Sequence, residues 1–499
     1  MTAYSIIADI GTGAVKAECF SKDGDRIAQG IAHYPSNVEG YDEINPEIWF
    51  EAFSDAVREL GSSADIRKAE YLVLTGQMQD LILVSDGRAL RDAVLYFAHR
   101  PCGRYEEFVN TLGMERIAEI SGNAPDPAGF PAKLMWLAEN EPMVLNEAER
   151  ILCGAHDYIS YKLTGSCRTD PTTASTTGLM NPVNGAWAEE IIKNVPRCPD
   201  LVPDICQGDS EDGTVCEKYA AALGVSPQLK IIHGVGDVGA SALSMEAAGF
   251  RRSCYLGTSG WILDTGSLLN PGNPFAGVFN LRHPTKKRLI RVAPMLTAAG
   301  SFDWLMGIFN PDGDDHDTLF RDFAHDTAGM KPDECRLLFL PYLSGERSPF
   351  KDPDASGMFL GLKRDTGRTE IFRAVEEGLS FSLRSVLYSL DEGVNQREAT
   401  DRESPLILTG GGVSIFGLPQ IIADICRVSV SVADNARYSG TRALLSLVPV
   451  TPMPTQKSEE LCSPTYDHDV YAEKYNLFRD AYIKTKELMH ALNEIQLGG

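Results

Sequence analysis

The chain has 499 residues, which is more than one hydrophobic core usually holds, so two domains are expected. Its 43% hydrophobic and 23% charged residues are typical of globular proteins and argue against disorder. The formal net charge of −23, without any local run of Lys or Arg, disfavours nucleic-acid and anionic-membrane partners.

The first predicted element is a β-hairpin. Residues 5–10 form an apolar run typical of a strand, residues 11–13 read Gly-Thr-Gly, and residues 14–20 predict the returning strand. A third strand at 26–33 and a helix at 46–60 follow, the helix because its apolar residues recur at helical spacing. Later segments alternate in the same way, which predicts an α/β architecture. These segments are the strands 70–74 and 405–408, the helix 371–390 and a mostly polar helix at 470–495.

A related pattern returns near the middle of the chain. Residues 257–260 read Gly-Thr-Ser-Gly and lie between two apolar runs, 253–256 and 261–264. A Gly-Thr-x-Gly turn between strands therefore occurs twice, about half a chain apart, which indicates a duplicated domain. We place the boundary after residue 246 and expect domains 1–246 and 247–499.

The two glycine-rich turns predict phosphate contacts. Glycines at a hairpin tip let backbone amides approach phosphate oxygens, and an acid at the strand end, here Asp9, can hold magnesium through water. Two such tips facing each other would hold a polyphosphate between the domains. The alternative for each is a plain glycine-rich turn.

Two further segments place polar or glycine residues after apolar strands. Asp237 follows the strand 229–232 within His-Gly-Val-Gly-Asp-Val-Gly, where it could accept a proton from a substrate hydroxyl; the alternative is a helix N-cap. Three glycines at 410–412 follow the strand 406–408 and permit close approach of a ring or ribose before a predicted helix. The alternative there is a tight strand-to-helix connection.

Together these segments resemble the FGGY carbohydrate kinases over nearly the whole chain, and within them the xylulokinases. Residues 75–79, Thr-Gly-Gln-Met-Gln, resemble the sugar-binding GQMH segment, and residues 170–178 resemble the DxSxAxxT stretch. The most specific match is 340–349, Leu-Pro-Tyr-Leu-Ser-Gly-Glu-Arg-Ser-Pro, close to LPYLSGERTP. The C-terminal signature is matched at 357–362 and 370–375 but fails at Glu376, where an apolar residue is usual.

The resemblance implies two actin-like (ribonuclease H-like) ATPase domains with an interdomain cleft, which close over ATP and a sugar. It implies that Asp237 is the general base and that Asp9 and Asp237 hold Mg²⁺. Nucleotide contacts are implied for Gly11, Thr12, Gly13, Lys16, Gly257, Thr258, Gly300, Gly411 and Gly412. The sugar-binding candidates are Gln77, Met78, Gln79, Arg100 and Asp237, with core packing as the alternative for Met78 and pairing with a structural acid as the alternative for Arg100.

The departures from the xylulokinase pattern fall near the sugar. Ala98 replaces the acid of the W-N-D-x-R segment, Gln79 stands where His is usual, and Val238 follows the catalytic Asp in place of Asn. We expect ATP-dependent phosphorylation of a sugar hydroxyl, with a ketopentose such as D-xylulose as the first candidate. The alternatives are another acceptor (ribulose, gluconate, glycerol or a tetritol), a catalytically weak sugar-binding regulator, or an actin- or chaperone-like ATPase.

The remaining expectations concern location and partners. The eleven cysteines are scattered without CxxC pairs or His/Cys spacing typical of metal sites, which favours free thiols. The N-terminus shows no basic leader and no apolar stretch reaches membrane-spanning length, so a cytoplasmic protein without membrane or nucleic-acid partners is expected. A homodimer is a further expectation.

Overall fold

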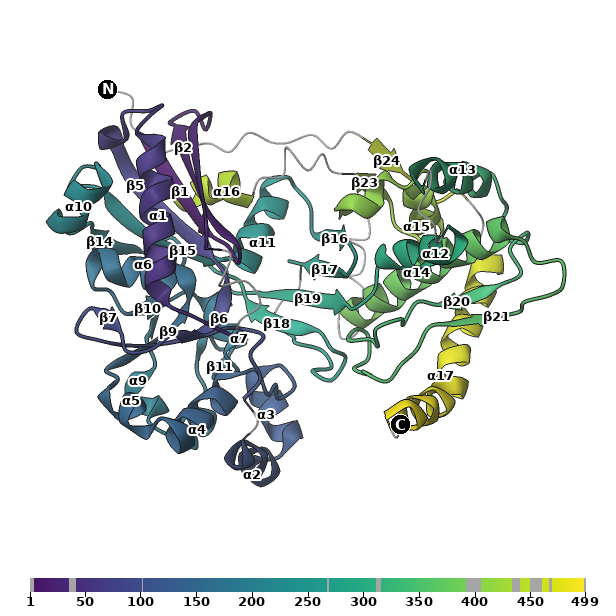
Figure 1. Cartoon of the computed structure of the whole chain (residues 1–499), viewed down its shortest axis with the longest axis horizontal. Helices are drawn as coiled ribbons and strands as arrows, with labels where there is room; N and C mark the ends of the chain where they lie inside the picture. Colours follow the sequence, from purple (N-terminus) through teal and green to yellow (C-terminus); the bar gives the residue numbers. More distant parts are fainter. Residues whose placement is uncertain are drawn as a thin grey trace. The chain divides into compact units, whose positions relative to one another are not determined.

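The computed structural model of the protein (Figure 1) describes residues 4–35, 42–100, 102–266, 269–310, 316–391, 405–432, 440–448, 460–465 and 469–497. The chain divides into two compact units. Unit 1 comprises Met1–Ala247, Asn280–Ile290 and Ser439–Thr455, and unit 2 comprises Ala248–Phe279, Arg291–Tyr438 and Gln456–Gly499. The domain boundary after residue 246 stays a prediction.

Unit 1 is built on a six-stranded sheet in the order β14-β15-β5-β1-β2-β3. β1 pairs antiparallel with β2 and parallel with β5, and β15 is parallel to β5, so three neighbouring strands point the same way. The predicted hairpin, third strand and helix are all present. The strands are β1 (Tyr4–Ile10), β2 (Ala14–Ser21), β3 (Arg26–His33), β5 (Ala69–Gly76), β14 (Glu211–Thr214) and β15 (Lys230–Gly236).

A second sheet and several helices complete unit 1. This sheet has the order β4-β8-β6-β7, with β9 beside β6. Its strands are β4 (Glu43–Ile44), β6 (Met78–Ser85), β7 (Arg88–Ala89), β8 (Ala93–Val94) and β9 (Arg150–Gly154). Two small two-stranded sheets pair β10 (Arg168–Thr169) with β13 (Asp204–Ile205) and β11 (Met180–Asn181) with β12 (Ala186–Trp187). The helices are α1 (Pro46–Leu60), α2 (Gly103–Leu112), α3 (Met114–Ser121), α4 (Phe130–Asn140), α5 (Pro142–Glu147), α6 (Ala155–Thr164), α7 (Pro171–Thr176), α8 (Glu189–Ile192), α9 (Cys198–Leu201), α10 (Glu217–Leu223), α11 (Asp237–Ala247) and α16 (Gly440–Ala443).

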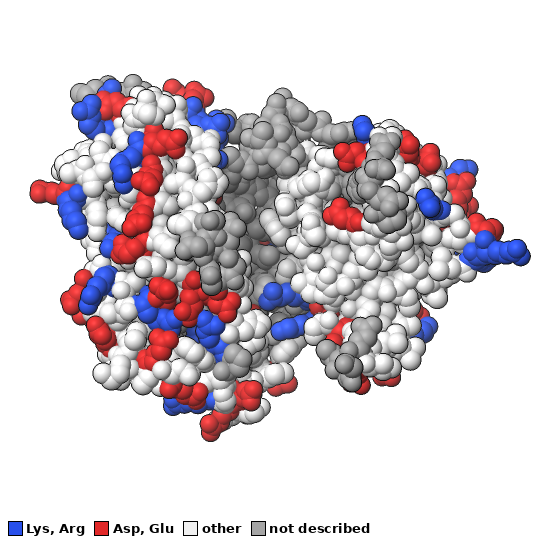
Figure 2. Space-filling model, viewed as in Figure 1, with Lys and Arg blue, Asp and Glu red and all other residues white. Residues whose placement is uncertain are grey.

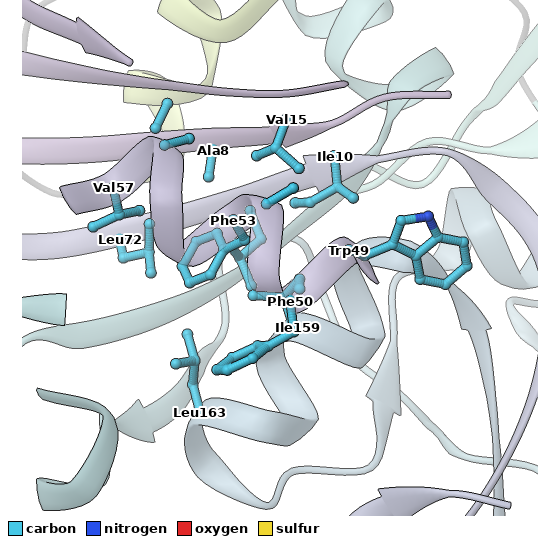
Figure 3. Close-up of a cluster of buried hydrophobic side chains, with 14 of the residues drawn as sticks. Ala8, Ile10, Val15, Trp49, Phe50, Phe53, Val57, Leu72, Ile159 and Leu163 are labelled. Carbon is cyan, nitrogen blue, oxygen red and sulfur yellow. The ribbon is translucent and has the colours of Figure 1, made fainter. Parts of the chain in front are cut away.

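The core of unit 1 forms where α1 covers the sheet. The helix starts at Asn45, whose side chain accepts a hydrogen bond from Glu47 N, with Pro46 at the first helical position. One face of the helix is buried, and Figure 3 shows Phe53 among residues of β1, β2 and α6 in an apolar cluster, with Trp49 at its edge. Each fully buried aromatic side chain stabilises the fold by about 1.5–3 kcal/mol. The exposed positions of α1 include Glu51, Asp55 and Glu59. Figure 2 shows a row of acidic side chains on this part of unit 1.

The later part of the chain holds a seven-stranded sheet in the order β18-β19-β17-β16-β22-β23-β24. The strand order β22-β16-β17-β19 matches the order β5-β1-β2-β3 in unit 1. Each of the hairpins β1–β2 and β16–β17 has a parallel strand beside its first strand and an antiparallel strand beside its second. The strands are β16 (Arg252–Leu256), β17 (Gly260–Asp264), β18 (Phe279–Arg282), β19 (Leu289–Met295), β22 (Leu406–Thr409), β23 (Val430–Val432) and β24 (Glu460–Cys462), with a separate pair β20 (Leu338–Leu340) and β21 (Met358–Leu360).

The long helix α14 (Arg368–Asp391) lies in the core of unit 2, where it packs against α15 (Leu418–Cys426), α12 (Gly300–Phe309) and α13 (His316–Ala328). The tail helix α17 (Asp469–Leu497) is present where a polar helix was expected. Although its composition is mostly polar, one side of α17 is apolar and buried, because Tyr471, Tyr475 and Phe478 lie in a cluster with α14.

Candidate active site

The ends of three parallel strands in unit 1 lie at the same level. Ile10, Gly76 and Gly236 occupy one row across β1, β5 and β15. Because carboxyl ends of parallel strands meet at one edge of a sheet, the residues that follow them leave the sheet side by side. These are three residues proposed from the sequence, Gly11, Gln77 and Asp237.

The first hairpin presents its glycine tip to solvent. Thr12 and Gly13 are exposed, and a β-carbon added at Gly13 would meet no atom within 4 Å. Tyr34 holds the tip from behind, since its hydroxyl donates to Gly11 O at 2.8 Å and its N–H donates to Gly13 O at 3.1 Å. The tip is therefore an anchored and open loop, as phosphate binding by backbone amides requires.

Two acids stand next to this tip. Asp9 lies opposite Lys16 in the hairpin register, and the Lys16 ammonium is 3.1 Å from Glu18. Burial raises the pKa of Asp9, and the positive charge of Lys16 opposes that rise. Asp237 is the first residue of α11, and its Oδ1 accepts a hydrogen bond from Val238 N at 2.7 Å. Its carboxylate is exposed, yet the surrounding chain removes part of its hydration and, with the negative charge of Asp9, raises its pKa.

The predicted sugar segment is more buried than the hairpin tip. Gln77 is 5% exposed and its Oε1 has no hydrogen-bond partner within the described part of the chain. Met78 packs on Gly236, where an added β-carbon would overlap the Met78 sulfur, so Gly236 is required for this contact. The Gln79 backbone adopts a left-handed conformation with φ 64°, and its side-chain amide Nε2 donates to Ala128 O at 3.3 Å. Such backbone strain in a non-glycine residue is common at functional sites.

Arg100 has acidic partners on its own unit. Its guanidinium lies 3.1 Å from Asp42 Oδ2 and 2.7 Å from Glu43 Oε1, and it stacks over the Trp136 ring at 5.4 Å. Pairing with acids was the alternative that the sequence left open for this residue. Contact of Arg100 with sugar stays a prediction.

Sequence reasoning missed two buried ionisable side chains beside the sugar segment. Asp80 and Lys133 have no exposed surface. Lys133 Nζ donates to the carbonyl oxygens of Gln79 at 3.0 Å and Leu95 at 2.8 Å, and Asp80 Oδ1 accepts from Tyr96 N at 3.0 Å. Burial raises the pKa of Asp80 and lowers the pKa of Lys133. The lysine within the apolar run 130–137 is the signal that could have indicated a buried charged group here.

Asp170 connects the 170–178 motif to the catalytic candidate. Its Oδ1 caps α7 by accepting from Thr172 N at 2.8 Å, and its Oδ2 accepts from Gly236 N at 3.2 Å. The motif therefore fixes the strand end that directly precedes Asp237.

The second hairpin tip lies against a helix start within unit 2. Thr258 and Ser259 are exposed, while the Thr258 carbonyl accepts from Ala298 N at 2.9 Å and Gly300 N at 3.1 Å. A β-carbon at Gly300 would lie 2.8 Å from Thr258 O, so only glycine permits this approach of α12 to the tip. Gly257 N donates to Ser259 O and closes the turn.

The glycine triplet follows β22 at the neighbouring strand end. Gly410 has φ 90° and sits on Leu256 of β16, where an added β-carbon would lie 2.5 Å from Leu256 O. Gly411 is exposed and open, and Gly412 is buried against Leu256. The helix expected directly after the triplet begins later, because a short 3₁₀ turn at Gly411–Ser414 comes before α15.

Comparison with known proteins identifies this architecture. Residues 4–244 match the N-terminal domain and residues 254–440 the C-terminal domain of the FGGY family of carbohydrate kinases. The chain belongs to this family. The prediction of two actin-like domains of the FGGY fold is thereby confirmed, and the protein is a carbohydrate kinase whose substrates are ATP and a sugar.

Several of the similar proteins are xylulose kinases. The chain is 28% identical over 440 residues to the xylulose kinase of Staphylococcus xylosus, covering 86% of this chain and 87% of that protein. It is 25% identical over 511 residues to the xylulose kinase of Bacillus subtilis (strain 168), covering 99% of both. Among solved structures, xylulose kinase from Rhodospirillum rubrum has a TM-score of 0.84 at 22% identity, covering 98% and 100%. Gluconate kinase from Lactobacillus acidophilus has a TM-score of 0.79 at 23% identity, covering 99% and 98%.

The described helices were also compared with the length and apolarity that a membrane span requires. None of them meets both requirements.

Proposed function

We propose that this FGGY kinase phosphorylates a terminal hydroxyl of a ketopentose, with D-xylulose as the first candidate, and that Asp237 is the general base. The observation that carries the proposal is the common row of Ile10, Gly76 and Gly236, from which the phosphate-binding tip, the sugar segment and Asp237 all emerge. The xylulose kinases among the relatives support the choice of sugar.

The proposed chemistry uses Asp237 as a proton acceptor. Its carboxylate takes the proton of the sugar hydroxyl while that oxygen attacks the γ-phosphorus of ATP, and the bond to the β,γ-bridging oxygen breaks to give the sugar phosphate and ADP. A raised pKa brings the base closer to working pH, which suits proton transfer. The backbone amides of Thr12 and Gly13 in unit 1 and of Thr258 in unit 2, all in exposed residues, are proposed to bind phosphate oxygens. Gly11 is proposed to border the phosphates without donating, because its N–H donates to Ala14 O.

The donor set also fits a magnesium ion. Asp9 and Asp237 are carboxylates whose negative charges act on each other, and oxygen ligands are those that Mg²⁺ prefers. We propose that they hold Mg²⁺, directly or through water, and that the ion neutralises phosphate charge when bound. Lys16 is proposed to contact phosphate, and Gly300, Gly411 and Gly412 to border the adenosine.

The sugar pocket is proposed to include Gln77, Met78, Gln79 and Arg100. A sugar acid or another polyol is the second candidate, because the buried Ala98 leaves the 96–100 segment without the acid usual in xylulokinases. A cytoplasmic location and a homodimer stay predictions.

The test measures ADP released from ATP and Mg²⁺ across ketopentoses, polyols and sugar acids. Asp237→Asn should lower turnover by about 10²- to 10⁴-fold without loss of folded protein. Asp55→Asn, at an exposed acid on α1, is the matched control and should retain wild-type turnover. Near-normal turnover of the Asp237 variant would remove it from the role of base, and turnover only on a sugar acid or polyol would replace D-xylulose as substrate. Binding without turnover across the panel would favour a regulator.

A further inference from the structure

A second group of ionisable side chains lies inside unit 1, away from the solvent. His156 and Asp157 belong to the first turn of α6, and His233 belongs to β15. None of the three has exposed surface. His233 is far from His156 and Asp157 along the chain, so the spacing of these residues in the sequence did not indicate a metal site.

The ring nitrogens of both histidines converge on one carboxylate oxygen. Asp157 Oδ1 is 3.1 Å from His156 Nε2 and 3.2 Å from His233 Nε2. Despite these distances, none of the three atoms makes a hydrogen bond of acceptable geometry within the described residues. A buried polar atom without a partner costs about 1–3 kcal/mol, so three of them at one point indicate an additional ligand.

The distances match those between ligands of one metal ion. Ligand atoms at 2.0–2.1 Å from a tetrahedral zinc ion lie about 3.3 Å from each other. The two distances to Asp157 Oδ1 are near this value. In contrast, His233 Nδ1 is 2.7 Å from Asp212 Oδ2, which is an ordinary hydrogen-bond length.

That hydrogen bond has the form of an outer-sphere contact. A carboxylate can only accept, so Nδ1 of His233 carries a proton, and in the neutral ring Nε2 then has the lone pair that faces Asp157. Metal-binding histidines usually donate their other ring N–H to a carboxylate in this way. Asp212 is itself held by Ser160 Oγ at 2.5 Å and by Arg168 Nη1 at 3.0 Å. Cys206 also lies near His233 and Asp212, but that overlapping set would need the Nδ1 already used.

The charges around the site favour a divalent cation. Asp157 and Asp170 are buried, the side chain of Asp212 has no exposed surface, and Asp170 Oδ2 is 3.3 Å from His156 Nε2. With neutral histidines, three carboxylates and the paired Arg168 sum to −2. The competing arrangement is a single imidazolium at His233, whose pKa the carboxylates of Asp157 and Asp212 raise against the opposing effect of burial.

We propose that His156, Asp157 and His233 bind one divalent transition-metal ion, with zinc the expected member of the class, as a structural site separate from the magnesium site at Asp9. Two imidazoles and a carboxylate are ligands that suit zinc. The ion joins α6 to β15. Through Asp170, which accepts a hydrogen bond from Gly236 N, it also supports the strand end before Asp237.

Metal content of the full chain tests the proposal directly. Because the ligands are buried, the metal should enter as the chain folds, so the protein is produced in zinc-supplemented medium and passed through gel filtration. Elemental analysis should find about one zinc per chain. His156→Gln and His233→Gln should each reduce it at least fivefold. His283→Gln is the matched control, since His283 is equally buried but pairs with Glu246, and should retain the metal.

X-ray absorption at the zinc edge of the wild-type protein identifies the ligand atoms of the metal directly. It therefore tests the proposal even if the histidine variants do not fold. Two imidazole ligands and one oxygen ligand are expected. A wild-type chain with less than a tenth of an equivalent of metal, full metal retention in both histidine variants, or a sulfur ligand would overturn the assignment. The readout is metal content rather than phosphoryl transfer, so the kinase proposal and this one fail independently.

Discussion

Glu376 is a buried acid at the position where FGGY sequences usually have an apolar residue. It lies in α14 with no exposed surface, and neither carboxylate oxygen has a hydrogen-bond partner among the described residues. The nearest cation, Arg373, is 3.8 Å away and is engaged by Glu377 at 3.0 Å and by the Tyr471 hydroxyl at 2.7 Å. Burial therefore raises the pKa of Glu376 to about 8.

This shift predicts how stability depends on pH. In the unfolded chain Glu376 releases its proton near pH 4.5, whereas the folded protein keeps it until about pH 8. Between these values the unfolded state binds fewer protons, so the free energy of unfolding falls by about 1.4 kcal/mol per pH unit. From pH 6 to pH 8 the wild type should lose about 2–3 kcal/mol relative to Glu376→Gln, which does not titrate. Below pH 4.5 this contribution is constant.

The measurement is chemical unfolding of both proteins at pH 5, 6, 7 and 8, with the transition of unit 2 compared between them. Glu377→Gln is the control, because Glu377 is equally buried but pairs with Arg373 and Lys474. Removing the Glu377 charge should lower the free energy of unfolding by about 3–5 kcal/mol. The difference between Glu377→Gln and the wild type should not shrink as pH rises. A difference between wild type and Glu376→Gln that stays constant from pH 5 to pH 8 would refute the reasoning.

Three other substitutions test how the site is held. Lys133→Met removes the donor to carbonyl groups beside the sugar segment and should destabilise the protein by about 3 kcal/mol, with a larger rise in KM for sugar than for ATP in steady-state kinetics. Gly236→Ala adds a methyl group where Met78 packs, and should lower kcat/KM for sugar at least tenfold while circular dichroism stays unchanged. Gly300→Ala places a methyl group 2.8 Å from Thr258 O and should weaken ATP binding, measured by calorimetry, without weakening sugar binding; equal effects on both ligands would contradict this assignment.

Local patterns were sufficient to predict much of the fold. The hairpin, the third strand and α1 are present within about a residue of their predicted bounds, because alternation and helical spacing there agree with the final packing. The glycine triplet was harder. Gly410 must lie against Leu256 of the neighbouring strand, and this tertiary contact sets a 3₁₀ turn before the helix.

Partners from distant segments could not be predicted in this way. Lys133 contacts carbonyl oxygens of residues 54 and 38 positions earlier, and the His156 and His233 rings meet across α6 and β15. A single sequence records such residues only as isolated polar positions in apolar runs, which also occur on exposed faces. Their roles follow from burial and from the direction of the strands, and both are properties of the complete fold.

The absence of an acid at residue 98 is only part of the change near the sugar segment. Ala98 is fully buried, while Asp80 directly follows the Gln77–Gln79 segment and binds Tyr96 N, at the start of the 96–100 segment. Because burial raises the pKa of Asp80, this carboxyl group holds its proton more readily than a free aspartate and can then donate a hydrogen bond as well as accept one. The region therefore retains an acid. Asp80 lies outside the 96–100 segment and accepts a hydrogen bond from its Tyr96 N–H. The choice of sugar should depend on this pair of positions together, so a substrate panel on the wild-type chain is more informative than the identity of residue 98 alone.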